Sequence, residues 1–279
     1  MNDRNQRVAA IGFDLLAPSE PRILQVTTPV FREYPSGTLE SIGSAILLRV
    51  GDEALVLSAA HVLDHATETS PLYIGSHDSG VLLQGRWFRT PLPESGQRED
   101  DRVDVGCARL LAKAVDSFDH TCFLASAELA PHRILSPGDH VVLSGYPCTK
   151  QRWAGKLERE ASLYAVIAEC SPVEDYGTLG VDRSHAVVLG FDKRRVRTRH
   201  GPATAPDLWG VSGGGLWILR RPGPEQPPAP LLAGIAIEWH KTRRKRVVAT
   251  RIEVLLYGIW GHWPELRPFL PWGPAERAT

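Results

Sequence analysis

The feature that most constrains the fold is a series of short apolar or alternating segments that recurs along most of the chain. Turn residues separate these segments, and the chain holds 25 Gly and 22 Pro. Short strands at roughly ten-residue spacing are typical of an all-β barrel or sandwich. Neither βαβ alternation nor a fixed-period repeat is visible, which disfavours a parallel α/β sheet and a repeat array. The predicted strands lie at 44–50, 54–60, 81–88, 104–111, 140–146, 162–169, 185–191, 215–220, 231–239 and 246–252.

Helix signals are few, and the two ends of the chain look different from its middle. Residues 60–64 predict one helical turn after a strand, and 253–263 predict a helix that Pro264 stops. The Pro-rich segment 221–230 separates two good strands and is therefore interpreted as a hairpin loop. We expect residues 1–20 to form an arm or an extra edge element, and the Pro-rich tail 264–279 to be irregular.

Composition limits the partners and the compartment. The 32 basic and 32 acidic residues cancel, so global charge predicts neither a nucleic acid nor a membrane as a partner. The first twenty residues lack the apolar region of a secretory leader, because Asp14 breaks their apolar stretch. The four cysteines, Cys107, Cys122, Cys148 and Cys170, form no CxxC or Cys/His cluster. We therefore expect a cytoplasmic protein with reduced thiols, without a metal or cofactor and without a membrane partner.

Ser212 is the candidate nucleophile. It lies in GVSGGGLW (210–217), just before a strongly apolar strand. A serine needs a base, an orienting acid and an oxyanion hole, and a tight turn lets the amides of Gly210 and Ser212 point into one site. One alternative is a plain Ser/Gly turn. Another is the G-x-S-x-G elbow of α/β-hydrolases, which fits poorly because no Asp follows Ser212.

His61 is the candidate base. It follows two alternating strands that end in the small residues Ala59 and Ala60, which let a helical turn pack closely at a barrel rim. A structural histidine is the alternative. His61 and His65 also approximate an inverted zincin pattern, but the segment is too short for a supporting helix and no further ligand is evident.

Asp104 is the candidate orienting acid. It stands where a polar stretch turns into an apolar strand, and a carboxylate entering such a strand needs a partner. Orienting an imidazole is one such role, and an ordinary aspartate at a strand end is the alternative. The neighbouring Asp100 and Asp101 are expected on the solvated surface.

Together these segments resemble the chymotrypsin/trypsin family of serine proteases. SAAHVL is similar to the family's TAAHC-type box, DVGCARL to its D-[IV]-A-x-x-x-L box and GVSGGGLW to GDSGGPL, in the same chain order. The similarity spans about residues 38–263. The resemblance implies an all-β fold of two six-stranded antiparallel β-barrels packed together with a short C-terminal helix. The first barrel would span 21–120 and the second barrel with its helix 121–263.

The resemblance also implies the role of each residue. His61 would act as general base and then as general acid, Asp104 would fix its tautomer, and Ser212 would attack the scissile carbonyl. The amides of Gly210 and Ser212 would form the oxyanion hole. The chain departs from secreted members at Val211, where they carry the aspartate that captures a new N-terminus. We therefore expect N-terminal trimming to leave activity unchanged.

Further departures point to one branch of the family. The family's histidine is flanked by a cysteine, and this chain has Val62 there, which is consistent with a fold without disulfides. These features are more similar to the bacterial cytosolic branch, whose members are often controlled by partner domains or a defence sensor.

The substrate pocket is less sharply defined by the sequence. Asp207 in the pocket would give a preference for a basic residue, which is the reading we favour. Alternatively, Asp207 faces solvent and Val247 makes the pocket shallow and apolar. Two basic runs, at 193–199 and 241–246, would attract an acidic substrate, an acidic partner or a nucleic-acid trigger, or serve solubility alone. The candidate pocket residues are Pro206, Asp207, Trp209, Ile237, Glu238 and Val247.

The leading hypothesis is a serine endopeptidase that cleaves one or few protein substrates through an acyl-enzyme, under the control of a regulatory protein partner. Nucleic acid is not expected as a direct substrate. A protease-fold binding module without turnover is the second hypothesis, and a serine esterase on the same scaffold is the third.

Overall fold

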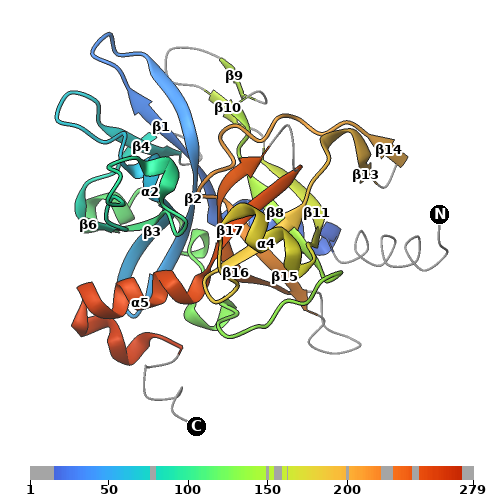
Figure 1. Cartoon of the computed structure of the whole chain (residues 1–279). Helices are drawn as coiled ribbons and strands as arrows, with labels where there is room; N and C mark the ends of the chain where they lie inside the picture. Colours follow the sequence, from blue (N-terminus) through green and yellow to red (C-terminus); the bar gives the residue numbers. More distant parts are fainter. Residues whose placement is uncertain are drawn as a thin grey trace.

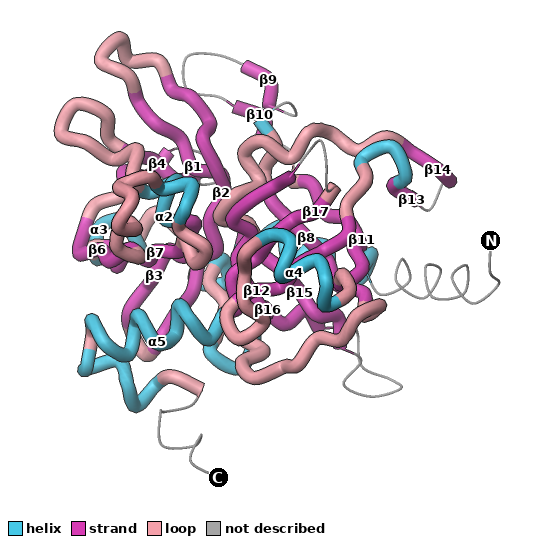
Figure 2. The backbone as a smooth tube through the Cα atoms, in the orientation of Figure 1, coloured by secondary structure: helices cyan, strands magenta, loops and turns pink. Residues whose placement is uncertain are grey.

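The computed structural model describes residues 16–75, 80–148, 151–153, 159–161, 163–198, 201–220, 229–240 and 245–271. Two β units lie side by side, and a helix near the C-terminus lies against the first of them (Figure 1). Strands dominate, and the helical segments are short and peripheral (Figure 2). No helix in the described ranges combines the length and apolar character needed to cross a membrane.

The second half of the chain forms a closed antiparallel barrel of six strands in the order β11-β12-β17-β16-β15-β8. This confirms the predicted six-stranded barrel for this half. Strand β15 pairs with β16 in antiparallel fashion. Of the predicted hairpin loop 221–230, residues 221–228 lie outside the described residues and residues 229–230 begin β16. The barrel strands are β8 (His140–Gly145), β11 (Tyr164–Cys170), β12 (Ala186–Gly190), β15 (Gly215–Arg220), β16 (Ala229–His240) and β17 (Arg246–Arg251).

The first half forms a seven-stranded sheet in the order β5-β4-β1-β2-β3-β7-β6, with β5 and β6 at its edges. A second closed six-stranded barrel is therefore not confirmed. The sequence missed β1 because Pro29 interrupts its apolar run, and β4 because it has only four residues. The strands are β1 (Thr27–Glu33), β2 (Leu39–Val50), β3 (Glu53–Ala59), β4 (Leu72–Gly75), β5 (Gly80–Leu82), β6 (Gly85–Arg89) and β7 (Val105–Leu110).

The helices agree with the sequence in the middle of the chain and differ at its ends. The predicted single turn is α2 (Ala60–Leu63), and the predicted C-terminal helix is α5 (Ile252–His262). Residues 16–26 are helical and do not form an edge strand. The tail expected to be irregular begins with a 3-10 helix, Pro264–Phe269.

The remaining short elements lie outside the two sheets. They include two small hairpins, two α-helices and four 3-10 helices: β9 (Gln151–Trp153) with β10 (Arg159–Ala161), β13 (Val196–Thr198) with β14 (Gly201–Ala203), α3 (Ala112–Val115), α4 (Val173–Leu179), η1 (Arg98–Asp100), η2 (His120–Cys122), η3 (Ser126–Glu128) and η5 (Lys193–Arg195).

The two β units share one apolar core, which fixes their relative position. The larger buried cluster contains residues of the first sheet, such as Leu57, together with Trp217 and Val248 from the barrel and Leu255 from α5. A second cluster fills the barrel interior and includes Val211. Because the larger cluster is continuous across both units, the loops at their junction are held on a packed scaffold.

Candidate active site

His61 lies at the junction of the two units. Strand β3 runs directly into α2, and His61 is the second residue of that turn. The small residues Ala59 and Ala60 are buried, and the Ala60 amide donates to the Asp104 carbonyl at 3.0 Å. The imidazole keeps 34% of its side-chain surface exposed. The turn therefore anchors the backbone of His61 and leaves one edge of its ring open to the solvent.

Asp104 lies against that imidazole. Its Oδ2 is 2.5 Å from His61 Nδ1, and its Oδ1 accepts from the His61 amide at 2.8 Å. The Asp104 side chain is only 7% exposed, and its φ of 41° lies in the left-handed region that Asp tolerates better than most residues. Because both oxygens bind one residue, Asp104 orients the ring and leaves Nε2 as the nitrogen available to a substrate or nucleophile.

The electrostatics of Asp104 follow from this burial. Burial raises the pKa of the Asp104 carboxyl above its ordinary value, and the hydrogen bonds from the His61 side chain and backbone act in the opposite direction. The negative charge of Asp101 also raises the pKa of Asp104. Asp101, expected on the solvated surface, is in fact largely buried, because it accepts hydrogen bonds from Arg98 and Thr90.

Ser212 reaches the same junction from the barrel, but it makes no hydrogen bond to His61. Its Oγ lies 3.4 Å from the Ile237 carbonyl oxygen, and its own carbonyl accepts from the Ser44 amide at 2.8 Å. The Ser212 carbonyl oxygen and the side chain of Val62, the neighbour of His61, both lie close to the place that a Cβ on Gly43 would occupy. The structure thus joins His61 to Asp104 directly, and it places Ser212 nearby with its hydroxyl bonded elsewhere.

The loop that carries Ser212, residues 208–214, is built from two consecutive turns and is called the nucleophile loop below. The Val211 amide donates to the Leu208 carbonyl at 2.9 Å, and the Gly214 amide donates to the Val211 carbonyl at 2.8 Å. Gly210 (φ 91°) and Gly213 (φ 85°) occupy the third position of these turns. Positive φ at that position is the requirement of a type II turn, which glycine meets without strain.

The same turns leave two amides free on one side of the loop. Within the described part of the chain, the N–H groups of Gly210 and Ser212 donate no hydrogen bond. The carbonyls of the same two peptide units are occupied, because Trp209 O accepts from the Cys148 amide at 2.7 Å and Val211 O accepts from Gly214. In a planar trans peptide the N–H points opposite to the C=O. Both free amides therefore point away from these internal donors, which is the arrangement an oxyanion hole needs.

Gly213→Ala is expected to destabilise the protein by about 3 kcal/mol or more, because it combines a left-handed backbone with a severe overlap. A Cβ at Gly213 (φ 85°) would lie 1.9 Å from the Ser44 carbonyl oxygen. Chemical denaturation measures the loss. Gly37→Ala is the matched control, since Gly37 has a φ of 76° and nothing within 4 Å of an added Cβ. Equal losses in the two variants would contradict the steric argument.

The candidate pocket residues come from the loop before β15, from β16 and from β17. Asp207 is ion-paired with Lys193, so its carboxylate already has a cationic partner. Trp209 is 65% exposed, and its ring lies edge-on to Trp239 with the centroids 6.4 Å apart. Trp239 also makes an edge contact with Phe191 at 6.3 Å. This aromatic group stands beside the nucleophile loop, and sequence reasoning missed Trp239, Phe191 and Lys193.

The other candidate pocket residues are distributed over the barrel. Val247 is part of the barrel interior, and Ile237 contributes its carbonyl to Ser212. Glu238 is partly exposed and lies 3.2 Å from His240 Nε2. Pro206 is half-buried next to Asp207. The structure therefore places the Ile237 carbonyl beside the Ser212 hydroxyl, whereas Val247 packs into the core.

Lys193 of the first basic run and two residues of the second form close ion pairs in the described part of the chain. Lys245 pairs with Asp192 at 2.7 Å and Arg246 with Asp175 at 2.7 Å. Residues 199 and 241–244 of these runs lie outside the described residues. For the histidine-based zinc alternative, His65 Nδ1 lies 3.2 Å from Arg32 Nη1, and a guanidinium there disfavours a bound cation.

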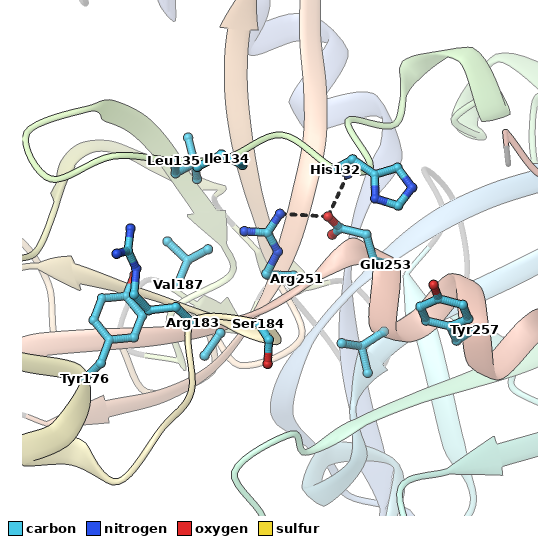
Figure 3. Close-up of a pocket in the computed structure, with 12 residues that line it drawn as sticks. His132, Ile134, Leu135, Tyr176, Arg183, Ser184, Val187, Arg251, Glu253 and Tyr257 are labelled. Carbon is cyan, nitrogen blue, oxygen red and sulfur yellow. Dashed lines mark hydrogen bonds and ion pairs between the residues drawn. The ribbon is translucent and has the colours of Figure 1, made fainter. Parts of the chain in front are cut away.

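A cavity of about 570 Å³ lies away from these residues, between one end of the barrel and the start of α5 (Figure 3). Arg251 and Glu253 line it side by side, with Glu253 Oε1 accepting from Arg251 Nη2 at 2.7 Å and from the His132 amide at 2.6 Å (Figure 3). None of the predicted site residues lines this cavity.

Comparison with known proteins identifies the fold. No protein-family model and no curated protein sequence matches the chain. Among solved structures it is similar to neuropsin, a serine protease expressed in the limbic system of mouse brain, with 17% identity and a TM-score of 0.55 over 86% of this chain and 95% of that chain. Human heparin binding protein is similar at 14% identity and a TM-score of 0.52, over 86% of this chain and 92% of that chain. The chain therefore has the fold of the trypsin-like serine proteases.

Proposed function

We propose that the chain is a serine endopeptidase with His61, Asp104 and Ser212 as its catalytic triad. In the proposed reaction Ser212 Oγ attacks the scissile carbonyl while its proton passes to His61 Nε2. The amides of Gly210 and Ser212 receive the oxyanion. His61 then gives the proton to the leaving amine. In the second half of the reaction His61 takes a proton from the water that attacks the acyl group, and it returns this proton to Ser212 Oγ as the acid leaves. No cofactor takes part.

The observation that carries the proposal is the bidentate contact of Asp104 with His61. Burying a carboxylate costs desolvation free energy, and this one has both oxygens on one histidine, at 2.5 and 2.8 Å. A purely structural role does not require that arrangement. The free amides of the nucleophile loop support the same conclusion. The hydroxyl of Ser212 must rotate from Ile237 toward His61 before it attacks, and catalytic hydrogen bonds often tighten only when substrate is bound.

The fold alone does not choose between turnover and binding. One structural neighbour is described as a serine protease and the other as a heparin binding protein. A binding module without turnover is therefore the alternative, and the Ser212–Ile237 contact is the observation that favours it. A serine esterase would use the same triad.

We further propose a reducing, cytoplasmic location and control by a partner protein, in the manner of the bacterial cytosolic branch. All four cysteines are free thiols. Val211 is only 3% exposed and packs into the barrel core, so apolar packing holds the nucleophile loop where an ion pair to a new N-terminus would otherwise be required. We expect one or few protein substrates.

The test uses purified full-length protein with a fluorophosphonate probe, a peptide library and a set of aryl esters. An endopeptidase labels at Ser212 and cleaves peptides. An esterase labels and cleaves only the esters. A failure of the wild-type protein to label, both alone and in a lysate of its source cells, would contradict catalysis and favour the binding module.

Substrate preference gives a separate prediction. Because Lys193 neutralises Asp207, we expect peptides with small or apolar residues before the scissile bond to be cleaved better than those with Lys or Arg. Lys193→Met should free the carboxylate and raise kcat/KM for basic residues about 10-fold, a step of about 1.4 kcal/mol. Asp207→Asn in the same background is the control and should remove the gain. A wild-type preference for Lys or Arg would contradict this assignment.

A further inference from the structure

Ser44, on strand β2, uses every one of its polar groups at the junction of the two units. It is fully buried. Its hydroxyl donates to the Gly210 carbonyl at 2.7 Å and accepts from the Tyr146 amide at 2.8 Å. Its amide donates to the Ser212 carbonyl at 2.8 Å, and its carbonyl accepts from the Ser58 hydroxyl at 2.8 Å. One residue of the first sheet is thus bonded to the nucleophile loop twice.

We propose that Ser44 is a positioning residue that holds the nucleophile loop in the shape of an oxyanion hole. The inference rests on the proposed function, because the shape of the loop matters for catalysis only if Ser212 attacks a substrate. Ser44 itself does not touch the reacting atoms.

The hydroxyl is what holds the Gly210 carbonyl in place. Gly210 has no side chain, and its φ of 91° is only one of the conformations open to a glycine. Without Ser44 Oγ, the buried Gly210 carbonyl and Tyr146 amide both lose their partner. Buried groups without partners are costly, so the peptide between Gly210 and Val211 would turn toward another donor. That rotation opens the turn closed by Val211 and Leu208, and the Gly210 amide leaves its position with it.

The same residue links the nucleophile to the base. Ser44 lies on β2, which pairs with β3, and the Ser58 hydroxyl adds a bond between these strands. Strand β3 leads into the turn that carries His61. The Ser44 amide holds the Ser212 carbonyl, so one buried residue sets the placement of Ser212 relative to His61. Loss of the Ser44 hydroxyl leaves the hydrogen bond from the Ser44 amide to the Ser212 carbonyl in place. It therefore affects only the part of the nucleophile loop around Gly210.

The experiment compares Ser44→Ala with Thr28→Val, a matched control. The Thr28 hydroxyl is also buried on the first sheet and donates to a backbone carbonyl, that of Gly75, at 2.8 Å. Hydrolysis of p-nitrophenyl acetate by the full chain is measured with hydrogen exchange of the Tyr146 and Val211 amides and with Tm. We expect Ser44→Ala to lower kcat about 10-fold to 100-fold with KM within about twofold, less than the loss of an oxyanion donor itself. Both amides should exchange at least about 10-fold faster, and Thr28→Val should change neither quantity.

The two readouts separate the two proposals. If wild-type protein neither hydrolyses the ester nor labels with the fluorophosphonate probe, alone and in a lysate of its source cells, the catalytic proposal fails. If the two amides still exchange faster in Ser44→Ala alone, the structural part of the inference, that Ser44 holds the loop, stands. If kcat and amide exchange in Ser44→Ala match those of Thr28→Val at a similar Tm, Ser44 is only a packing residue and the inference is overturned. A rise in KM with kcat unchanged would also overturn it.

Discussion

Ser212→Ala and His61→Ala should each abolish fluorophosphonate labelling and reduce hydrolysis by about 10⁴-fold or more. Nucleophile and base act as one unit, so removing either loses nearly the whole covalent pathway. Ser212→Ala should change stability little, because the Ser212 hydroxyl makes a single contact of 3.4 Å. His61→Ala should lower Tm, because it removes the partner of the buried Asp104 Oδ2. Labelling with the probe and hydrolysis of an aryl ester measure the activities, and calorimetry measures Tm.

Ser184→Ala is the matched control for Ser212→Ala. Ser184 is an exposed serine of the barrel unit that lines the cavity near Glu253 and not the triad. It should label and hydrolyse as the wild type does. Labelling that persists in Ser212→Ala would mean that another serine carries the reactivity, and the assignment of the nucleophile would be wrong.

Most of the barrel strands could be predicted from sequence because each alternates or stays apolar between turn residues. The prediction was wrong where local pattern and long-range pairing disagree. Strand β1 carries Pro29 and still pairs with β2 and β4, next to an irregularity between Val30 and Phe31. The open edges of the first sheet likewise depend on how distant segments pair, which a period of two residues does not specify.

The candidate site likewise contains residues that could be predicted from the sequence and residues that could not. His61 and Asp104 were recognisable because each stands where an apolar strand begins or ends, and the structure brings them together. Ser44 could not be recognised from the sequence, because its role depends on a contact with Gly210, 166 residues away. Lys193 neutralises Asp207 from within a basic run whose local pattern suggested only a charged loop. Contacts of this kind have no local signature.

Asp104→Asn should lower kcat about 10⁴-fold while the protein stays folded. The asparagine oxygen can still accept from the His61 amide, as Asp104 Oδ1 does at 2.8 Å. Its NH₂ group then faces His61 Nδ1 and donates to it. The imidazole proton moves to Nε2, so that nitrogen can no longer accept the proton of Ser212. A pH profile of ester hydrolysis measures the loss, and Asp101→Asn is the control that changes a neighbouring carboxylate without touching the ring.

The stability of the wild type and of Asp104→Asn at different pH values tests how burial changes the pKa of the Asp104 carboxyl. Burial raises the pKa of the Asp104 carboxyl in the folded state, so the folded protein binds a proton there more readily than the unfolded chain. Stability contributed by this group is therefore full below the ordinary pKa of Asp and is lost as the pH rises through the raised value. The free energy of unfolding of the wild type, minus that of Asp104→Asn, should fall as the pH rises above about 3.9, the ordinary pKa of Asp. A difference that rises over this range would mean that the bonds from His61 outweigh burial, and that the carboxylate is stabilised and not strained by its place at the site.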